Sequence, residues 1–231
     1  MKPDLSQTSA ADFDVAVLGG NLLGAMAAIM LRRRGLRVVV LESRPEGSPQ
    51  KIVVGEAITE GTSVFLRHEI GLTDWLKANV FRKFGFDFVT LPRGATKPPE
   101  RIEDCHELLL STVPLEHRPT ALQRLIPTYH VERTSINSEV QKRARAEGAD
   151  FRFGATVEHV DIGDAAAGRL HTVRYSDGGQ PKELTSRWLV DCSGRRNLLG
   201  RQLGITRPDS TLKTASVWNR FDGVNADPTV F

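Results

Sequence analysis

The residues of this 231-residue chain best suited to chemistry are a glycine-containing turn, Gly19 to Gly24, and an acid, Glu42, placed 23 positions after Gly19. Gly19 permits a tight turn, and Gly24 lets the following helix pack close to a sheet. The free N–H groups and positive dipole end of that helix can hold a pyrophosphate. A carboxylate that ends the second strand can accept both hydroxyls of an adenosine ribose. The spacing therefore predicts a dinucleotide site.

The turn departs from the usual G-x-G-x-x-G pattern at one position. With Gly19 and Gly24 as the outer glycines, the middle glycine falls on Asn21. Asn tolerates unusual backbone angles better than other non-glycine residues. We therefore expect the turn to form but to bind the phosphates more weakly, and we expect Gly20 to keep the turn flexible. An ordinary α/β turn could carry the same glycines, so the prediction depends on the full order of strand, turn, helix, strand and acid.

That order requires particular elements around the turn. Residues 15–18 are a short apolar run suited to a parallel strand buried on both faces. An Ala-rich helix ending at Gly35 and a strand over 38–42 follow. The arginines at 32–34 fall in the last helical turn, where they complement the helix dipole. A nucleic-acid patch is the alternative for these arginines, but no interleaved aromatic residues support it.

The remaining chain shows several further periodic segments. Helices are expected at 59–70, 74–79, 135–147 and 197–203, and strands at 83–89, 107–112, 128–131, 150–153, 156–162, 168–176, 183–190 and 213–221. In the strand at 83–89, period-two alternation places three phenylalanines on one face and Lys83 on the other. The short connections among the strands of 156–190 indicate an antiparallel meander.

The composition is that of an ordinary globular protein, with 40% hydrophobic and 26% charged residues and a net charge of +3. No apolar stretch approaches the roughly 20 residues needed to cross a membrane, and residues 1–12 carry no signal-peptide core. Cys105 and Cys192 have no motif spacing, which favours a reduced, cytoplasmic setting without a disulfide framework. Neither a metal site nor nucleic-acid binding is indicated.

Four stretches, spread over nearly the whole chain, resemble the N-terminal part of FAD-dependent monooxygenases and, within them, flavin-dependent (tryptophan halogenase-like) halogenases. They are the turn at 19–24 with Glu42-Ser43-Arg44, residues 54–57 leading into 65–66 and 70–72, Tyr129 to Arg133, and 190–195 with Leu199 and Arg201. The implied fold class is α/β: a Rossmann-like FAD-binding domain with a β-meander crossover and a small inserted substrate-side sheet.

The resemblance also implies a domain plan. It comprises a flexible leader at 1–12, an FAD-binding βαβ and strap region at 13–82, the inserted sheet at 83–127, the continued FAD-binding domain at 128–205, and the start of a truncated substrate or C-terminal region at 206–231.

The resemblance further assigns cofactor-binding roles. Gly19, Gly20, Asn21 and Gly24 would hold the FAD pyrophosphate, and Glu42, with Ser43 and Arg44, the adenosine side. Gly55, Glu56 and Ala57 match a strap that runs beside the flavin. Ser193 and Gly194 match a turn near the flavin end of the domain. Arg133 matches an arginine at the phosphate or ribitol region, and its planar donors suit a phosphate. The alternatives are a solvated charge for Arg133, a plain strand-to-helix turn for Ser193-Gly194, and a small buried thiol for Cys192.

Lys83 matches the lysine that halogenases place between the flavin and the substrate, where it is implied to hydrogen-bond or capture hypohalous acid. A desolvated ammonium can lose its proton and act as a donor or nucleophile. The alternative is a solubilising lysine at the start of a strand.

The family's W-x-W-x-I-P stretch is missing, since the tryptophans are Trp75, Trp188 and Trp218. The expected function is an FAD-dependent oxidoreductase that uses reduced flavin and O₂ to halogenate or hydroxylate an aromatic or carrier-bound substrate, with FADH₂ made from NAD(P)H directly or supplied by a separate flavin reductase. A reductase or non-catalytic flavoprotein fragment is the alternative. The meander argues against a plain NAD-dependent dehydrogenase, because such a fold would continue to alternate strands and helices.

Overall fold

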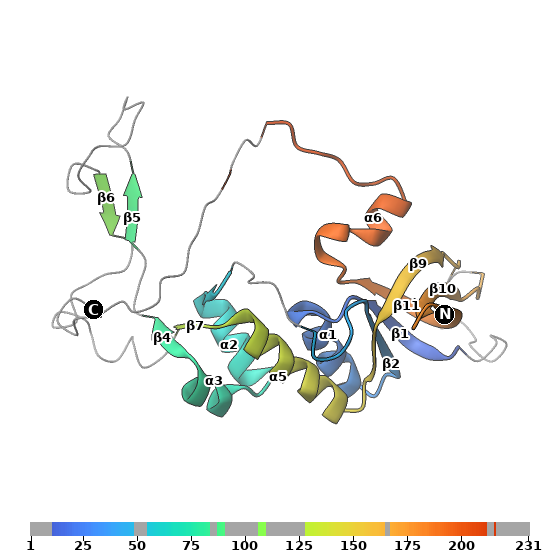
Figure 1. Ribbon diagram of the computed structural model, residues 1–231, viewed down its shortest axis with the longest axis horizontal. Coiled ribbons are helices and arrows are strands. Elements are labelled where there is room, and N and C mark those ends of the chain that lie inside the picture. The colour runs from blue at the N-terminus through green and yellow to red at the C-terminus, as the bar shows by residue number, and fades with distance from the viewer. Residues whose placement is uncertain are drawn as a thin grey trace, which may run out of the picture.

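The computed structural model describes residues 11–48, 55–83, 87–90, 106–109, 128–164, 167–211 and 215. In this part of the chain the strands form a six-stranded sheet, an antiparallel three-stranded sheet and a two-stranded pair (Figure 1). The strands are β1 (Phe13–Leu18), β2 (Val38–Glu42), β3 (Ala57–Ile58), β4 (Phe81–Lys83), β5 (Asp87–Thr90), β6 (His106–Leu109), β7 (Thr128–His130), β8 (Asp150–Phe153), β9 (Ala155–Asp161), β10 (His171–Asp177) and β11 (Gln180–Asp191). The helices are α1 (Leu22–Arg33), α2 (Glu60–His68), α3 (Thr73–Asn79), α5 (Arg133–Ala146) and α6 (Leu198–Gln202), with a 3₁₀ turn at Gly194–Arg196 before α6.

The large sheet has the order β8-β2-β1-β11-β10-β9. Strands β8, β2, β1 and the second half of β11 run parallel, whereas β9, β10 and the first half of β11 form an antiparallel meander. Parallel strands end at a common edge of a sheet, so the segments after β1, β2 and β11 meet there. This edge carries the glycine turn, Glu42 and the Ser193 turn.

The central parallel strands β1 and β2 are buried on both faces, as their continuous apolar sequences require. Val15 and Val17 of β1 pack with Ile29 of α1 and Val140 of α5 in one core. Ala16 and Leu18, which point to the opposite face, pack with residues of the meander in a second core. The second core is completed by Val39, Leu41, Ala155, Val157, Val160, Val173, Tyr175 and Leu184. The meander therefore covers the face of the sheet that the helices leave open.

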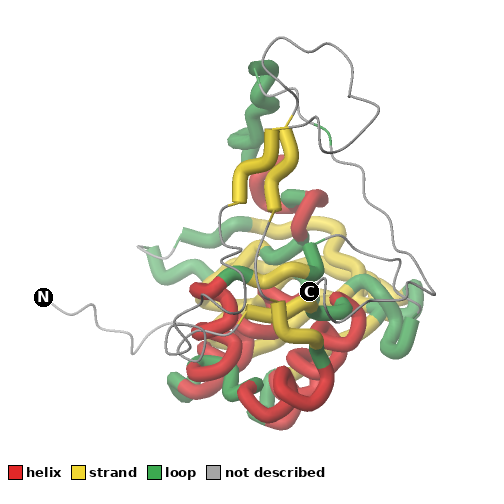
Figure 2. The backbone as a smooth tube through the Cα atoms, turned by 90° about the vertical axis from the view of Figure 1, so that its left-hand side faces the viewer, coloured by secondary structure: helices red, strands yellow, loops and turns green. Residues whose placement is uncertain are grey.

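The three-stranded sheet has the order β3-β7-β4, and its strands β4 and β7 lie beside α2 and α3, on the side away from the meander (Figure 1). The β5–β6 pair projects from the body of the molecule (Figure 2). Within the described residues no helix is long and apolar enough to cross a membrane.

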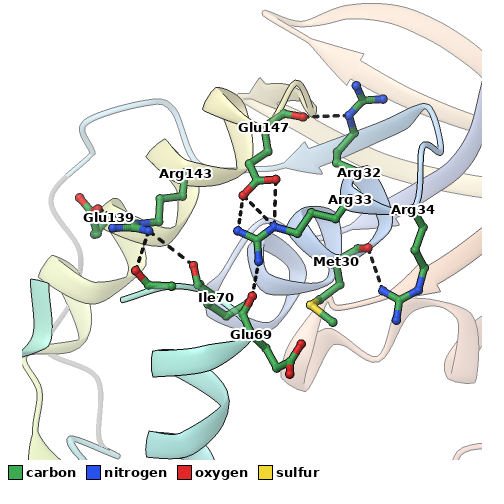
Figure 3. A network of polar contacts seen from close by, with 10 residues as sticks. Met30, Arg32, Arg33, Arg34, Glu69, Ile70, Glu139, Arg143 and Glu147 are labelled. Atoms are coloured by element: carbon green, nitrogen blue, oxygen red, sulfur yellow. Dashed lines mark hydrogen bonds and ion pairs between the residues drawn. The ribbon is translucent and has the colours of Figure 1, made fainter. Parts of the chain in front are cut away.

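The arginines at 32–34 help to fix the helices to one another (Figure 3). Arg33 of α1 pairs with the Glu147 carboxylate just after α5 and donates to the carbonyl of Glu69 just after α2. Arg32 donates to the Glu147 carbonyl (3.1 Å), and the side chain of Arg34 donates to the Met30 carbonyl of its own helix (2.9 Å). Gly35 adopts a φ of +79° after the helix, as expected of a C-terminal glycine. Helix termination and helix packing thus account for this basic run.

The predicted fold class is confirmed: an α/β, Rossmann-like domain with a β-meander crossover and a small additional sheet. The expected helices and strands of the large sheet are present, with ends that differ by a few residues. Lys83 differs from expectation, because it ends β4 rather than beginning a strand. Residues 84–86, 110–112 and most of 213–221 lie outside the described residues.

Candidate cofactor site

The glycine turn is held at the sheet edge by close backbone packing. The Gly19 N–H donates to the Leu41 carbonyl (2.9 Å), and the Cys192 N–H donates to the Leu18 carbonyl (2.8 Å). Gly19 has a φ of +104°, and a Cβ there would lie 2.4 Å from the Cys192 carbonyl oxygen. A Cβ on Gly24 would lie 1.9 Å from the Gly19 carbonyl oxygen. Both outer glycines are therefore required by space, and Gly19 also by its backbone angle.

Asn21 does not strain the turn. It precedes α1 as the N-cap residue with a φ of −65° and a ψ of −176°, which any residue can adopt. The expectation that Asn21 must tolerate an unusual backbone angle is thus wrong, because the left-handed position of the turn is Gly19. The Asn21 Oδ1 instead accepts a hydrogen bond from the guanidinium of Arg44.

Glu42 is buried, with 3% of its surface exposed, and both of its carboxylate oxygens accept hydrogen bonds. Oε2 accepts from the Gly20 N–H at 2.9 Å. Oε1 accepts from the backbone N–H and the Nε of Arg44, both at 3.0 Å. Oε2 keeps a second acceptor direction, so the group is oriented by the protein and can still receive a ribose hydroxyl there.

A cleft opens beside this turn and draws its walls from several elements. Six of the predicted cofactor residues line it: Gly19, Asn21, Glu42, Ser43, Arg44 and Ser193. Residues that the sequence did not single out as site residues complete the lining: Leu18, Leu41, Ala155, Val157, Cys192, Arg196 and Leu198. The strand β9 supplies an apolar wall, and the turn after β11 supplies Arg196. No local motif marks Ala155 and Val157, because they reach the cleft only through the crossing of the meander.

The Ser193 turn is fixed by Asp191, at the end of β11. Its Oδ1 accepts from the Ser193 N–H (2.9 Å) and its Oδ2 from the Leu199 N–H (2.8 Å). Burial would raise the pKa of Asp191, but these hydrogen bonds outweigh burial and lower the pKa. Gly194 has a φ of +63° and begins the 3₁₀ turn. Burial, followed by the charge of Asp191, raises the pKa of Cys192, which agrees with an unreactive half-buried thiol.

The predicted strap forms a second group, joined to the start of α5. Gly55 has a φ of +98°, and its carbonyl accepts from Nη1 of Arg133 at 3.4 Å. The Glu56 carbonyl accepts from the Val131 N–H (2.7 Å), and Ala57 pairs with β7. The Nε of Arg133 is buried and has no hydrogen-bond partner within the described part of the chain. A buried donor of this kind requires a partner, and an anionic group would supply one.

Lys83 lies on the three-stranded sheet, outside the cleft. It is 6% exposed, and burial lowers its pKa while the charge of Glu60 opposes this change. Its carbonyl accepts from the Thr128 hydroxyl at 3.1 Å. Burial, followed by the positive charge of Lys83, also lowers the pKa of His130 on the neighbouring strand. Lys83 is thus a buried lysine rather than a solubilising surface residue.

These residues fit FAD. The close-packed glycines Gly19, Gly20 and Gly24 leave no room for side chains where the pyrophosphate would approach, and the first turn of α1 offers N–H groups without intrahelical partners. Glu42 suits the ribose, and the partnerless Nε of Arg133 suits an anion. Among the residues that the structure describes, no cluster of three or more His, Cys, Asp or Glu side chains could hold a metal ion.

Comparison with known proteins agrees with this geometry. Residues 12–228 match the family model described as an FAD binding domain. The chain is 27% identical to a 1H-pyrrole-2-carbonyl-[peptidyl-carrier protein] chlorinase from Pseudomonas fluorescens, over 91% of this chain and 46% of that protein. It is 30% identical to an aklavinone 12-hydroxylase from Streptomyces peucetius subsp. caesius, over 85% of this chain and 38% of that protein.

Among solved structures, a ternary complex of aklavinone-11 hydroxylase with FAD and aklavinone matches with a TM-score of 0.62 and 25% identity, over 85% of this chain and 35% of that chain. The halogenase CmlS matches with a TM-score of 0.65, over 85% of this chain and 32% of that chain. The chain therefore spans less than half the length of the relatives it matches.

Proposed function

This chain belongs to the FAD binding domain family, and we propose that it is the cofactor-binding part of an oxidoreductase that uses reduced flavin and O₂ to halogenate or hydroxylate an aromatic or carrier-bound substrate. The observation that carries the proposal is the meeting of Gly19, Glu42 and the Ser193 turn in one cleft at the edge of the parallel strands. Relatives of both reaction types, a chlorinase and a hydroxylase, support the two chemistries.

Within this proposal the protein orients the cofactor, while the bound flavin supplies the oxygen chemistry. The first turn of α1, after Gly19, holds the pyrophosphate, and Glu42 binds the adenosine ribose. Arg133 donates to the phosphate or ribitol region from its place beside the Gly55 carbonyl. Ser43 and Arg44 flank the adenosine side.

The remaining predicted residues belong to the flavin side. Glu56 and Ala57 form the strap, and Ser193 and Gly194 form the turn near the flavin end. Reduced flavin is made from NAD(P)H on the protein or is supplied by a separate flavin reductase.

Lys83 is the proposed catalytic residue for halogenation. Its burial favours the neutral amine, which can donate a hydrogen bond to hypohalous acid or attack the halogen of that acid. In the attack an N–halogen bond forms as the O–halogen bond breaks, and the released hydroxide leaves with an amine proton as water. Because Lys83 lies on the same small sheet as Ala57, it is placed on the strap side of the molecule.

Cofactor binding is tested by titrating FAD into the purified chain and following flavin fluorescence. We expect saturable binding that Glu42→Ala weakens by more than tenfold, since a charge-assisted hydrogen bond contributes about 1.5–3 kcal/mol. Lack of binding by the unaltered chain would overturn the proposal.

The reaction class is tested by supplying FADH₂, O₂ and bromide with a panel of phenols, indoles and carrier-bound pyrroles. Lys83→Met should abolish brominated products, whereas the matched variant Lys77→Ala, which alters an exposed lysine of α3, should leave them unchanged. Hydroxylated products without bromination would select the monooxygenase function. Flavin reduction by NAD(P)H without either product would select the alternative reductase function. The test includes the monooxygenase and reductase outcomes because Trp75, Trp188 and Trp218 do not form the W-x-W-x-I-P stretch of the halogenases.

A further inference from the structure

Gly20 is enclosed by side chains from three elements. A Cβ built on Gly20 would lie 2.5 Å from Cζ of Phe151 on β8 and 2.9 Å from Cβ of Glu42 on β2. The third element is α5, which contributes Gln141, a side chain with only 9% of its surface exposed. The middle of the glycine turn is therefore a buried backbone segment rather than a free surface loop.

Both backbone polar atoms of Gly20 are bound by buried side chains. Its N–H donates to Oε2 of Glu42 at 2.9 Å, and its carbonyl accepts from Nε2 of Gln141 at 2.8 Å. Gln141 lies 121 residues from Gly20 in the sequence, so this contact exists only in the folded chain. Glu42 has a proposed role toward the ribose, whereas the mechanism above leaves Gln141 without one.

We propose that Gln141 is a positioning residue for the pyrophosphate-binding turn. The Gly20 carbonyl and the Asn21 N–H belong to one planar trans peptide, so they point in opposite directions. By holding the carbonyl on the side of α5, Gln141 directs the Asn21 N–H away from that helix. The Asn21 N–H then adds to the donors of the first helical turn that receive the phosphate.

The same helix also sets the position of Arg133. Arg133 is the first residue of α5 and contacts the strap at Gly55, while Gln141 lies two turns further along. At 1.5 Å of rise per residue, the two positions are about 12 Å apart along the helix axis. Helix α5 thus fixes the spacing between the phosphate turn and the arginine that we assign to the phosphate or ribitol region. The inference rests on the proposed FAD site.

The test compares Gln141→Leu with the unaltered chain by FAD titration. Leucine keeps most of the side-chain volume but removes the donor, which leaves the buried Gly20 carbonyl without its partner. We expect FAD affinity to fall roughly tenfold. Gln141→Glu, which keeps the shape and replaces the donor by a carboxylate, should weaken binding at least as much.

The matched control is Val140→Ala, which loosens the packing of the same helix at a fully buried residue. We expect Val140→Ala to lower the melting temperature at least as much as Gln141→Leu while keeping the FAD affinity within about threefold of the unaltered chain. An equal loss of affinity in the two variants would show that Gln141 acts only through stability, and would overturn the inference.

Hydrogen exchange on the FAD-free chain tests the contact independently of the cofactor. The amides of the glycine turn should exchange faster in Gln141→Leu than in the unaltered chain, and Val140→Ala should leave their relative protection unchanged. Unchanged exchange in Gln141→Leu would overturn the positioning role even if FAD binds. Absence of FAD binding by the unaltered chain, with faster exchange in Gln141→Leu, would instead overturn the proposed function and leave the contact between Gln141 and the turn supported.

Discussion

At the scale of single residues, Gly24 and Gly61 both occupy the first turn of a helix but have opposite surroundings. A Cβ on Gly24 would meet the Gly19 carbonyl oxygen at 1.9 Å, a backbone atom that cannot move aside without opening the turn. A Cβ on Gly61 would meet nothing within 4 Å, and the residue is exposed near the start of α2. The same substitution should therefore have opposite effects at the two positions.

We expect Gly24→Ala to destabilise the chain by about 1–3 kcal/mol and to abolish FAD binding, because the added methyl group overpacks the turn. Gly61→Ala should stabilise it by about 0.5–1 kcal/mol, since alanine restricts the unfolded chain and favours the helix. Urea unfolding of both variants measures the two changes. A stable Gly24→Ala variant with normal FAD affinity would contradict the account of the glycine turn.

Glu132, the N-cap residue of α5, carries a pH-dependent part of the stability. Its carboxylate accepts from the N–H groups of Thr134 (3.0 Å) and Ser135 (2.7 Å). Burial would raise the pKa of Glu132, but hydrogen bonds from the side chains of Ser135 and Thr134, followed by those from their N–H groups, lower it from an ordinary 4.5 to about 2. Because the folded pKa lies below the unfolded value, the stabilisation is present above pH 4.5 and is lost as the pH falls toward 2.

Glu132→Ala should therefore cost about 1 kcal/mol at neutral pH, the usual loss for an N-cap. The difference from the unaltered chain should shrink as the pH is lowered through 4.5, as measured by urea unfolding at a series of pH values. Glu132→Asn is the control, because asparagine caps a helix without a carboxylate, so its stability relative to Glu132→Ala should not vary with pH. A constant difference between Glu132→Ala and the unaltered chain at all pH values would show that the carboxylate has an ordinary pKa.

At the scale of the elements, the helices on one face of the sheet are joined through Arg33. This side chain reaches Glu147 after α5 and the Glu69 carbonyl after α2, and it forms hydrogen bonds of 2.9 and 3.0 Å from Nε to the Glu147 carboxylate. The side chain of Arg34, its neighbour, donates to the Met30 carbonyl of its own helix (Figure 3). Arg34 therefore serves as a matched control for the contribution of Arg33 to helix packing.

Arg33→Ala should lower the free energy of unfolding by about 1 kcal/mol, because a multiply bonded pair at the surface is worth more than a single exposed one. Arg34→Ala should change it by less than about 0.5 kcal/mol. Denaturant unfolding at low and high salt would separate the variants, since the Arg33 contribution should decrease in salt. Equal effects of the two substitutions would mean that the helices do not depend on this contact.

At the scale of the whole molecule, FAD should connect the large sheet to the small one. The glycine turn belongs to the edge of the large sheet, and the strap at Gly55–Ala57 leads into the small sheet. A cofactor that touches both should slow hydrogen exchange in residues 19–24 and 55–58 together. Helix α3, which carries no proposed cofactor residue, should be unaffected and serves as the internal control. Protection of only one of the two segments would contradict the proposed path of the cofactor.

Features of this molecule that depend on neighbouring residues could be predicted from the sequence, whereas features that depend on contacts between distant segments could not. The glycine turn, Glu42 and the buried parallel strands follow from local patterns, and the structure places them as expected. Ala155 and Val157 could not be assigned to the cleft, because their position there depends on the curvature of the meander. Gln141 could not be assigned to Gly20, because its spacing on α5 is that of any core position. The burial of Lys83 could not be predicted, because β4 begins at Phe81, two residues before the start of the expected strand.

One strand, β11, serves both halves of the large sheet: residues up to Ser186 pair with β10, and residues from Ser186 onward pair with β1. Chain breakage within β11 would deprive the meander and the parallel layer of a neighbour at the same time. The tight turn at Gly178 and Gly179, where both glycines have positive φ and are exposed, precedes this strand. New termini or an inserted reporter domain are therefore best introduced at that turn, which leaves the twelve-residue strand and the Ser193 segment at its end in one piece.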